Sequence, residues 1–280
     1  GLTWSPDGSL LAFSYGGCEG VVYLVDLDGN LRRVGDGSGP SWSPDGRWLA
    51  FGPNVPYSPC GVGCLDPALG PWEILVVDVT SGEEPRQLTT NGGAFTASRP
   101  IFSPDGSVVA FNGPHPEPDP AAGAFAAVYV VGADGKGQRI VARGAYVSGW
   151  IRDNRLLVAE EGSGRVHAID LESAETVPIG GDQAFGFEVS PDGSRLLSLA
   201  SDPVSDAQTV ILSEIDGGGI LAEHAGTAAR WAADSSLFVL ADRDLSRIML
   251  VDRNGSTMAT YPVDLVLGEL SVRPGPAPGS

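Results

Sequence analysis

The cysteines are the most closely spaced residues of this sequence that could do chemistry. Cys60 and Cys64 are separated by three residues, and Cys18 is the third cysteine of the chain. The close pair could form a local disulfide, one of them could bridge to Cys18, or all three could be free thiols. A structural zinc ion needs four ligands, and no second pair of ligands follows. We therefore expect a Cys60–Cys64 disulfide, which would indicate an oxidising compartment, and no metal site.

Histidines and charged residues offer fewer local motifs. His115, His167 and His224 are far apart in the sequence, and none has a partner at a metal-ligand spacing. The sequence also lacks the Gly-x-Ser-x-Gly turn of hydrolases and a phosphate-binding glycine loop. We therefore predict no catalytic residues and no cofactor. The best constellation for an enzyme combines Glu188, His224 and Arg230, which only the fold could bring together.

The overall charge is strongly negative, because the chain has 35 acidic and 17 basic residues and a formal net charge of −18. A negative field of this size repels phosphate backbones, so nucleic acid is not expected as a partner. It suits cationic partners, and it also serves solubility. No run of about 18 apolar residues occurs, so the sequence predicts no membrane-spanning segment.

The elements that must position these residues are defined by a recurring turn motif, Trp-Ser-Pro-Asp-Gly followed by an apolar run. Proline presets the turn, aspartate can bond its backbone, and glycine accepts positive φ, so we expect the motif aspartates to be structural. The spacing of the copies has a basal value of about 40 residues, the length of a four-stranded propeller blade. Copies with Trp, Phe or Val at the first position occupy 4–8, 42–46, 102–106 and 189–193, and weaker copies begin at Trp150 and Trp231.

Each repeat has a second half, a β-branched run that ends in Asp-Gly or Asn-Gly. Val22–Gly29 and Ile248–Gly255 are examples. These dipeptides favour tight hairpin turns, so we interpret Asn254-Gly255-Ser256 as a turn and not as a glycosylation acceptor. Each repeat therefore predicts four strands joined by a Pro-Asp-Gly turn, a loop and an Asp-Gly turn.

Six such repeats predict an all-β protein, a six-bladed β-propeller of four-stranded antiparallel blades. We expect one propeller domain over residues 1–273 and a Pro/Gly-rich tail over 274–280. Aromatic residues beside the turns are expected to fill the space between blades. Residues 268–275 resemble the first strand of a blade, and they could latch onto the first blade or begin a further unit. The blades are predicted to start near residues 2, 40, 100, 148, 187 and 229.

The repeated turn motif, with Pro85–Thr90 and Arg99-Pro100 ahead of the copy at 102–106, resembles the repeats of TolB-type propellers. The resemblance covers about residues 2–262. It implies an extracytoplasmic location (periplasmic, cell-surface or secreted) and protein binding, although such repeats specify fold and not activity. The sequence lacks the α/β domain that accompanies this propeller in TolB and the hydrolase domain of peptidase relatives.

Two proline-rich insertions follow the second strand of a blade, at 52–72 and at 112–125. We expect both to be loops on the propeller face that also bears the connections between blades. Stiff loops lose little entropy on binding, so this face is expected to recognise a protein or peptide. The candidate binding residues lie in these insertions and in the connections near the mouth of the central channel: Tyr57, Phe95, Arg99, His115, Tyr146, Phe185, Glu188, His224 and Arg230.

The sequence therefore predicts a non-catalytic binding or scaffold propeller. The alternative is a propeller enzyme that acts on a carbohydrate or peptide at the mouth of the channel. A third class is a sensor or structural module of a larger surface protein. Converging charged side chains at the channel mouth would favour an enzyme, whereas a flat patch of exposed aromatic residues would favour binding.

Overall fold

The structure of the 280-residue chain is a computed structural model. Two compact units divide the chain, Gly1–Ala145 and Tyr146–Ser280. The described part of the chain contains no helix with the length and hydropathy needed to span a membrane. The structure describes residues 2–15, 20–53, 73–90, 97–119, 124–151, 153–179, 184–201, 207–215, 219–232, 234–242 and 246–262.

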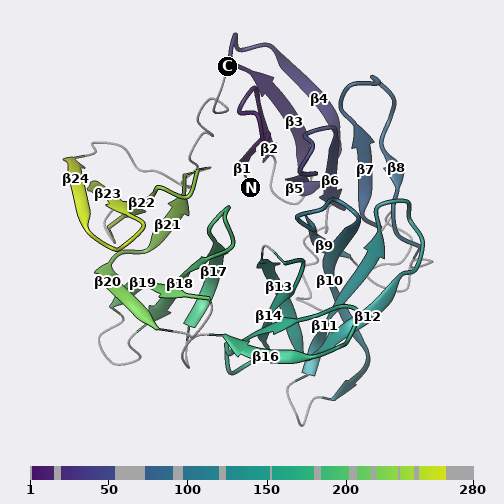
Figure 1. The fold of residues 1–280 in the computed structure, drawn as a ribbon. Helices are drawn as coiled ribbons and strands as arrows, with labels where there is room; N and C mark the ends of the chain where they lie inside the picture. The colour runs from purple at the N-terminus through teal and green to yellow at the C-terminus, as the bar shows by residue number, and fades with distance from the viewer. Residues whose placement is uncertain are drawn as a thin grey trace, which may run out of the picture. The chain divides into compact units, whose positions relative to one another are not determined.

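The chain forms six four-stranded antiparallel sheets, the blades of a six-bladed β-propeller, as the repeats predict (Figure 1). In every blade the strands lie side by side in chain order. The first and fourth strands are therefore the two edges of each sheet. The blades begin within about three residues of the predicted positions, because each first strand directly precedes its turn motif.

The first unit contains blades 1 to 3. Blade 1 consists of β1 (Leu2–Trp4), β2 (Leu10–Tyr15), β3 (Val21–Asp26) and β4 (Leu31–Asp36). Blade 2 consists of β5 (Ser38–Trp42), β6 (Trp48–Gly52), β7 (Leu75–Asp78) and β8 (Arg86–Gln87). Blade 3 consists of β9 (Ser98–Phe102), β10 (Val108–Asp119), β11 (Ala124–Gly132) and β12 (Arg139–Arg143).

The second unit contains blades 4 to 6, with the first residue of blade 4 at the unit boundary. Blade 4 consists of β13 (Ala145–Trp150), β14 (Leu156–Glu160), β15 (Val166–Ile169) and β16 (Thr176–Ile179). Blade 5 consists of β17 (Ala184–Val189), β18 (Arg195–Ser201), β19 (Gln208–Glu214) and β20 (Ile220–Ala225). Blade 6 consists of β21 (Ala228–Trp231), β22 (Leu237–Ala241), β23 (Arg247–Asp252) and β24 (Thr257–Pro262).

The turn motif is closed by its own side chains. In the first copy, Asp7 Oδ1 accepts hydrogen bonds from Ser5 Oγ at 2.6 Å and from the Ser9 amide at 3.0 Å. Ser5 Oγ in turn accepts from the Leu10 amide at 2.9 Å, and Gly8 has a φ of 69°. The same serine–aspartate bond recurs at Asp45, Asp105 and Asp192, so the structural role predicted for these aspartates is confirmed.

The hydrophobic core lies between consecutive blades, and the aromatic residues of the turn motif contribute to it as predicted. Trp42 packs in the cluster shared by blades 1 and 2, and Phe102 in the cluster shared by blades 2 and 3. Trp231 packs between blades 5 and 6, against Phe238 at a ring separation of 5.3 Å. Each blade therefore needs its neighbour to bury its apolar faces, which is the reason for the repeated architecture.

The insertion at 112–125 is not the loop expected from its prolines. Residues 112–119 continue β10, and 124–125 begin β11, with Pro114 opposite Ala126 and Asp119 opposite Ala124. The prolines at 114, 116 and 118 recur at every second residue, so their ring nitrogens fall on one edge of the strand and leave the other edge free of proline. The prediction failed because it took proline content alone as a sign of a loop.

Candidate functional site

The strongest site candidates lie on first strands, at the position directly before the first residue of the turn motif. In blades 5 and 6 this position holds Glu188 and Arg230, on strands β17 and β21, which contact each other. Opposite charges therefore occupy equivalent positions of neighbouring blades. The other four blades carry uncharged residues at this position: Thr3, Ser41, Ile101 and Gly149.

Glu188 bonds to blade 6 through both of its carboxylate oxygens. Its Oε2 accepts from Arg230 Nη1 at 3.3 Å, and its Oε1 accepts from the backbone amide of Trp231 at 3.2 Å. Because β21 is an edge strand of its sheet, half of its amides face away from β22 and need another acceptor. Glu188 satisfies one of these amides, and it thereby ties blade 5 to blade 6.

Burial raises the pKa of Glu188 to about 7, against the opposing effects of the Arg230 charge and the hydrogen bonds from Trp231 and Arg230. Burial has this effect because the ionised form of a carboxyl group is poorly solvated away from water. The side chain keeps 29% of its surface exposed, so protons and solvent reach it. A carboxyl group with such a pKa exchanges protons near neutral pH.

Arg230 is only partly used by its neighbours. Its Nη1 donates to Glu188 and also to the carbonyl oxygen of Ala229 at 2.9 Å. Within the described part of the chain, its Nε and Nη2 donate to no group, and the side chain is 44% exposed. The guanidinium group therefore has donors available to a ligand.

His224 does not join this pair. It lies on β20, the fourth strand of blade 5, and pairs in register with Val210. Its Nε2 is 3.0 Å from the carbonyl oxygen of Gly255, in the turn that joins β23 to β24. Blade 5 therefore carries Glu188 on one edge strand and His224 on the opposite one.

Tyr146 occupies the first strand of blade 4, β13. Its hydroxyl donates to Glu161 Oε1 at 3.0 Å, and burial together with this bond raises its pKa above the usual value. Glu161 and the neighbouring Glu160 directly follow the second strand of the blade. Glu160 Oε1 also lies 2.8 Å from His167 Nε2. The sequence analysis missed these two glutamates because their partners are 15 and 7 residues away in the sequence.

The remaining predicted binding residues are scattered. Arg99 is exposed on β9 and adopts a positive φ of 53°, beside a register shift between β9 and β10. His115 lies in β10 and Phe185 in β17, and the structure describes only their backbones. The predicted residues Tyr57 and Phe95 lie outside the described residues, as do Cys18, Cys60, Cys64, most of the 52–72 insertion and the segment 268–275.

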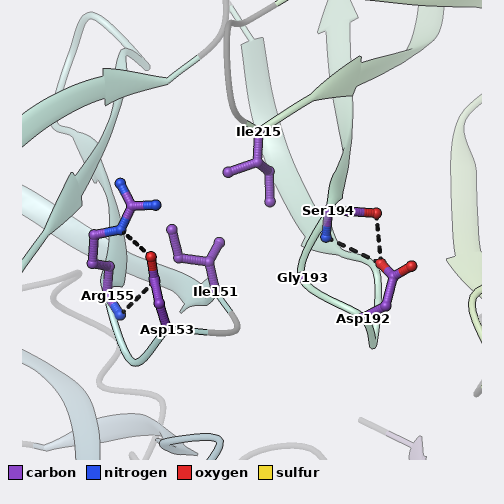
Figure 2. A pocket seen from close by; sticks show the side chains of 7 residues that line it. All are labelled: Ile151, Asp153, Arg155, Asp192, Gly193, Ser194 and Ile215. Atoms are coloured by element: carbon purple, nitrogen blue, oxygen red, sulfur yellow. Dashed lines mark hydrogen bonds and ion pairs between the residues drawn. The ribbon is translucent and has the colours of Figure 1, made fainter.

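A cavity of about 360 Å³ lies between the turns of blades 4 and 5. Figure 2 shows Asp153 and Arg155 on one side, Asp192 and Ser194 on the other, and Ile151 and Ile215 between them. Its volume is at the lower end of the range for small-molecule sites. Both carboxylates are already paired, Asp153 with Arg155 Nε at 2.7 Å and Asp192 with Arg253 at 3.0 Å. The charges of the described lining residues are therefore balanced by their partners.

No group of three or more metal-binding side chains occurs among the described residues. No family model matches the sequence, and no curated protein matches it.

Several solved propellers have the same fold at low sequence identity. An oligogalacturonate lyase in complex with manganese is 14% identical with a TM-score of 0.68, over 95% of this chain and 78% of the lyase chain. TolB from Acinetobacter baumannii is 15% identical with a TM-score of 0.62, over 92% of this chain and 65% of that one. A putative TolB from Agrobacterium tumefaciens is 17% identical with a TM-score of 0.58, over 83% and 85%. The chain thus has a TolB-like six-bladed β-propeller fold.

Proposed function

We propose that this chain is a binding propeller that recognises a protein or peptide with the extended hairpin of blade 3. The observation that carries the proposal is the length of its middle strands. β10 has 12 residues and β11 has 9, whereas the corresponding strands of the other blades have four to seven. The extra residues do not extend the rest of the sheet.

The hairpin leaves the sheet beyond Asn112. The pairing of β10 with β9 ends at Asn112, and the pairing of β11 with β12 ends at Ala127. Among the described residues, the strand pairing beyond these positions joins β10 to β11 and forms a two-stranded arm, with one further bond from the Gly144 amide to the Ala126 carbonyl oxygen at its base. A lone two-stranded ribbon is marginally stable by itself, so an arm of this kind is costly unless it is used.

The arm is held in place rather than loosely attached. The hydroxyl of Tyr129 donates to the carbonyl oxygen of Pro114 at 3.0 Å, and the Tyr129 ring stacks on Phe111 in the core. Its prolines further restrict the backbone. An arm that extends past the neighbouring strands and carries an exposed Glu117 offers a partner backbone hydrogen bonds at low entropic cost.

Site-specific photo-crosslinking tests this function. A photoreactive amino acid at Glu117 is expected to give adducts with a partner protein in extracts of the cells that produce the chain. The same amino acid at Glu172, an exposed position in blade 4, serves as the control. A variant with Asn-Gly in place of 114–126, joining Gly113 to its pair mate Ala127, should keep its melting temperature and lose the partner. Equal adducts at both positions would contradict the proposal.

A second candidate function is a propeller enzyme, and the observation that favours it is Glu188. A carboxyl group with a pKa of about 7 can act as a general acid or base near neutral pH, and Arg230 beside it could bind a charged substrate. Structural neighbours include the oligogalacturonate lyase and prolyl oligopeptidase B from Galerina marginata. Turnover of oligogalacturonate or of peptides, lost on Glu188→Gln, would establish this function in place of simple binding.

We also propose an extracytoplasmic location, on the basis of the TolB-like repeats and the Cys60/Cys64 spacing. Mass spectrometry of unreduced, alkylated protein with peptide mapping tests it. A disulfide between any two of the three cysteines is expected, and three alkylated thiols would count against export.

A further inference from the structure

We propose that the Nε–Nη2 edge of the Arg230 guanidinium group is a binding site for a single ligand carboxylate, and that the neighbouring Glu188 opposes this binding in its ionised form. This inference goes beyond the proposed hairpin function and does not depend on it, because the two sites share no residue.

The geometry of Arg230 suits a ligand carboxylate. Its Nη1 is occupied by the Ala229 carbonyl oxygen, which fixes the orientation of the guanidinium plane. Nε and Nη2, which donate to no group among the described residues, form the side edge of that plane. Two parallel N–H groups of this kind match the two oxygens of a carboxylate. Because the edge is already oriented and the side chain is 44% exposed, a ligand would meet a preformed fork.

Glu188 binds Arg230 only weakly. Their 3.3 Å contact lies beyond the usual range of N–H···O hydrogen bonds and uses a single nitrogen. Arg230 is the charged residue that acts on Glu188 among the described residues, and the residue paired with Glu188 on β18 is the apolar Leu197. A ligand carboxylate would therefore compete with one weak contact for the positive charge of Arg230.

Proton uptake by Glu188 removes this competition. Burial raises the pKa of Glu188 to about 7, so little free energy is needed to protonate it at neutral pH. A second negative charge on Arg230 would favour the protonated form further. Once protonated, Glu188 no longer neutralises the charge of Arg230 or repels a carboxylate that is bound to the Nε–Nη2 edge.

The charge of the whole chain limits which anions can bind. At a net charge of −18, the protein repels polyanions over long distances. A single carboxylate suffers least from this repulsion and makes full use of the fork. Such a group could come from the C-terminus of a peptide or from a small organic acid, and the experiment below separates these sources.

The test is an NMR titration with acetate, with triglycine and with triglycine amide, at pH 6 and pH 8. Because ionised Glu188 opposes binding, the affinity should be weaker at pH 8 than at pH 6 by up to about tenfold, the factor by which the protonated fraction falls around a pKa of 7. Triglycine amide should not bind at either pH. If acetate binds as tightly as triglycine, the result indicates that the natural ligand is a small organic acid. Tighter binding of triglycine than of acetate would indicate a peptide C-terminus.

Four variants decide the assignment. Glu188→Gln keeps the acceptor for the Trp231 amide and should bind equally at both pH values. Arg230→Gln should abolish binding. Arg230→Lys keeps the charge but not the paired N–H groups, so its affinity should lie between that of the wild type and that of Arg230→Gln. Arg33→Gln serves as the matched control, because Arg33 is also half-exposed and paired with one carboxylate, Asp36. The proposal would be overturned if Arg230→Gln and Arg230→Lys bound with wild-type affinity. It would also be overturned if triglycine amide bound as tightly as triglycine, or if Glu188→Gln kept the pH dependence of the wild type.

Discussion

His224 Nε2 lies 3.0 Å from the carbonyl oxygen of Gly255, which joins the outermost strand of blade 5 to the last turn of blade 6. Beside this bond the two blades touch closely, because a Cβ atom added to Gly255 would lie 2.2 Å from the Cβ of Ala222. The His224 ring also meets Phe238 edge-on at 6.3 Å. His224 is therefore part of the packing between blades.

The first prediction follows from this contact. Gly255→Ala should destabilise the protein by about 2–4 kcal/mol, from the positive φ of 92° and the overlap with Ala222. Gly29→Ala is the matched control, since Gly29 has a φ of 85° in the same turn of blade 1 with open space around it. The control should cost about 1 kcal/mol. Equal melting temperatures of the two variants would contradict a tight contact.

A second prediction compares two tryptophans at equivalent positions of the turn motif. Trp42 Nε1 donates to the Thr3 carbonyl oxygen at 3.2 Å, whereas Trp231 Nε1 is buried without a hydrogen-bond partner in the described part of the chain. Both side chains are less than a tenth exposed, so replacement by Phe removes a similar apolar area. Trp42→Phe should therefore cost about 1 kcal/mol more than Trp231→Phe in chemical unfolding. A larger cost at Trp231 would show that its indole N–H is bonded.

The third prediction concerns acid stability at Asp192. Burial of this carboxyl group acts to raise its pKa, but hydrogen bonds from Ser190 and Ser194 and the charge of Arg253 outweigh burial and lower the pKa to about 2. Because the folded pKa lies below the unfolded value of about 3.9, the stabilisation is complete above pH 4 and is lost as the pH falls towards 2.

Asp192→Asn should therefore lower stability by about 1–2 kcal/mol at pH 7, allowing for the 25% exposure of the Asp192 side chain. The difference from the wild type should shrink between pH 4 and pH 2 in urea unfolding. Asp28→Asn, at an exposed position, should change stability by less than about 0.5 kcal/mol. A gap between Asp192→Asn and the wild type that persists at pH 2 would refute this account.

The fourth prediction has the opposite sign and concerns Glu188. Its folded pKa of about 7 lies above the unfolded value of about 4.3, so the native state holds the proton more tightly. Wild-type stability should therefore fall as the pH rises from about 4.5 to 7. Glu188→Gln removes this dependence, and it should be more stable than the wild type above pH 7 by about 1–2 kcal/mol, given the 29% exposure. If the stability difference between Glu188→Gln and the wild type were the same at pH 4 and pH 8, the raised pKa of Glu188 would be contradicted.

Much of the fold could be predicted from the sequence because its signals are local. The bonds that close the first turn join Ser5, Asp7, Ser9 and Leu10, which are at most five residues apart. Glycine at the last position of the motif accepts the positive φ that the turn requires. A turn that is specified within five residues can be recognised wherever it recurs. The number of blades, the strand order and the role of the motif aspartates were therefore correctly predicted.

The blade-3 insertion shows where local signals mislead. Four prolines between residues 114 and 120 suggest a loop, yet three of them lie in β10 because their spacing of two matches the alternation of a strand. Pairing with β11 makes this segment a strand instead of a loop. Tyr129, 15 residues from Pro114, stabilises the pairing through its hydrogen bond to the Pro114 carbonyl oxygen.

The candidate site could be predicted only in part from the sequence. Glu188 and Arg230 could be named as candidates because they fall near the connections between blades, but His224 was grouped with them although it lies on the opposite edge strand of blade 5. By itself the sequence determined the repeated turns and the four-stranded blades, since these depend on bonds between near neighbours. Only the tertiary structure decided which charged groups meet, because Glu188 and Arg230 are 42 residues apart, and their pairing and the raised pKa of Glu188 arise from the packing of two blades.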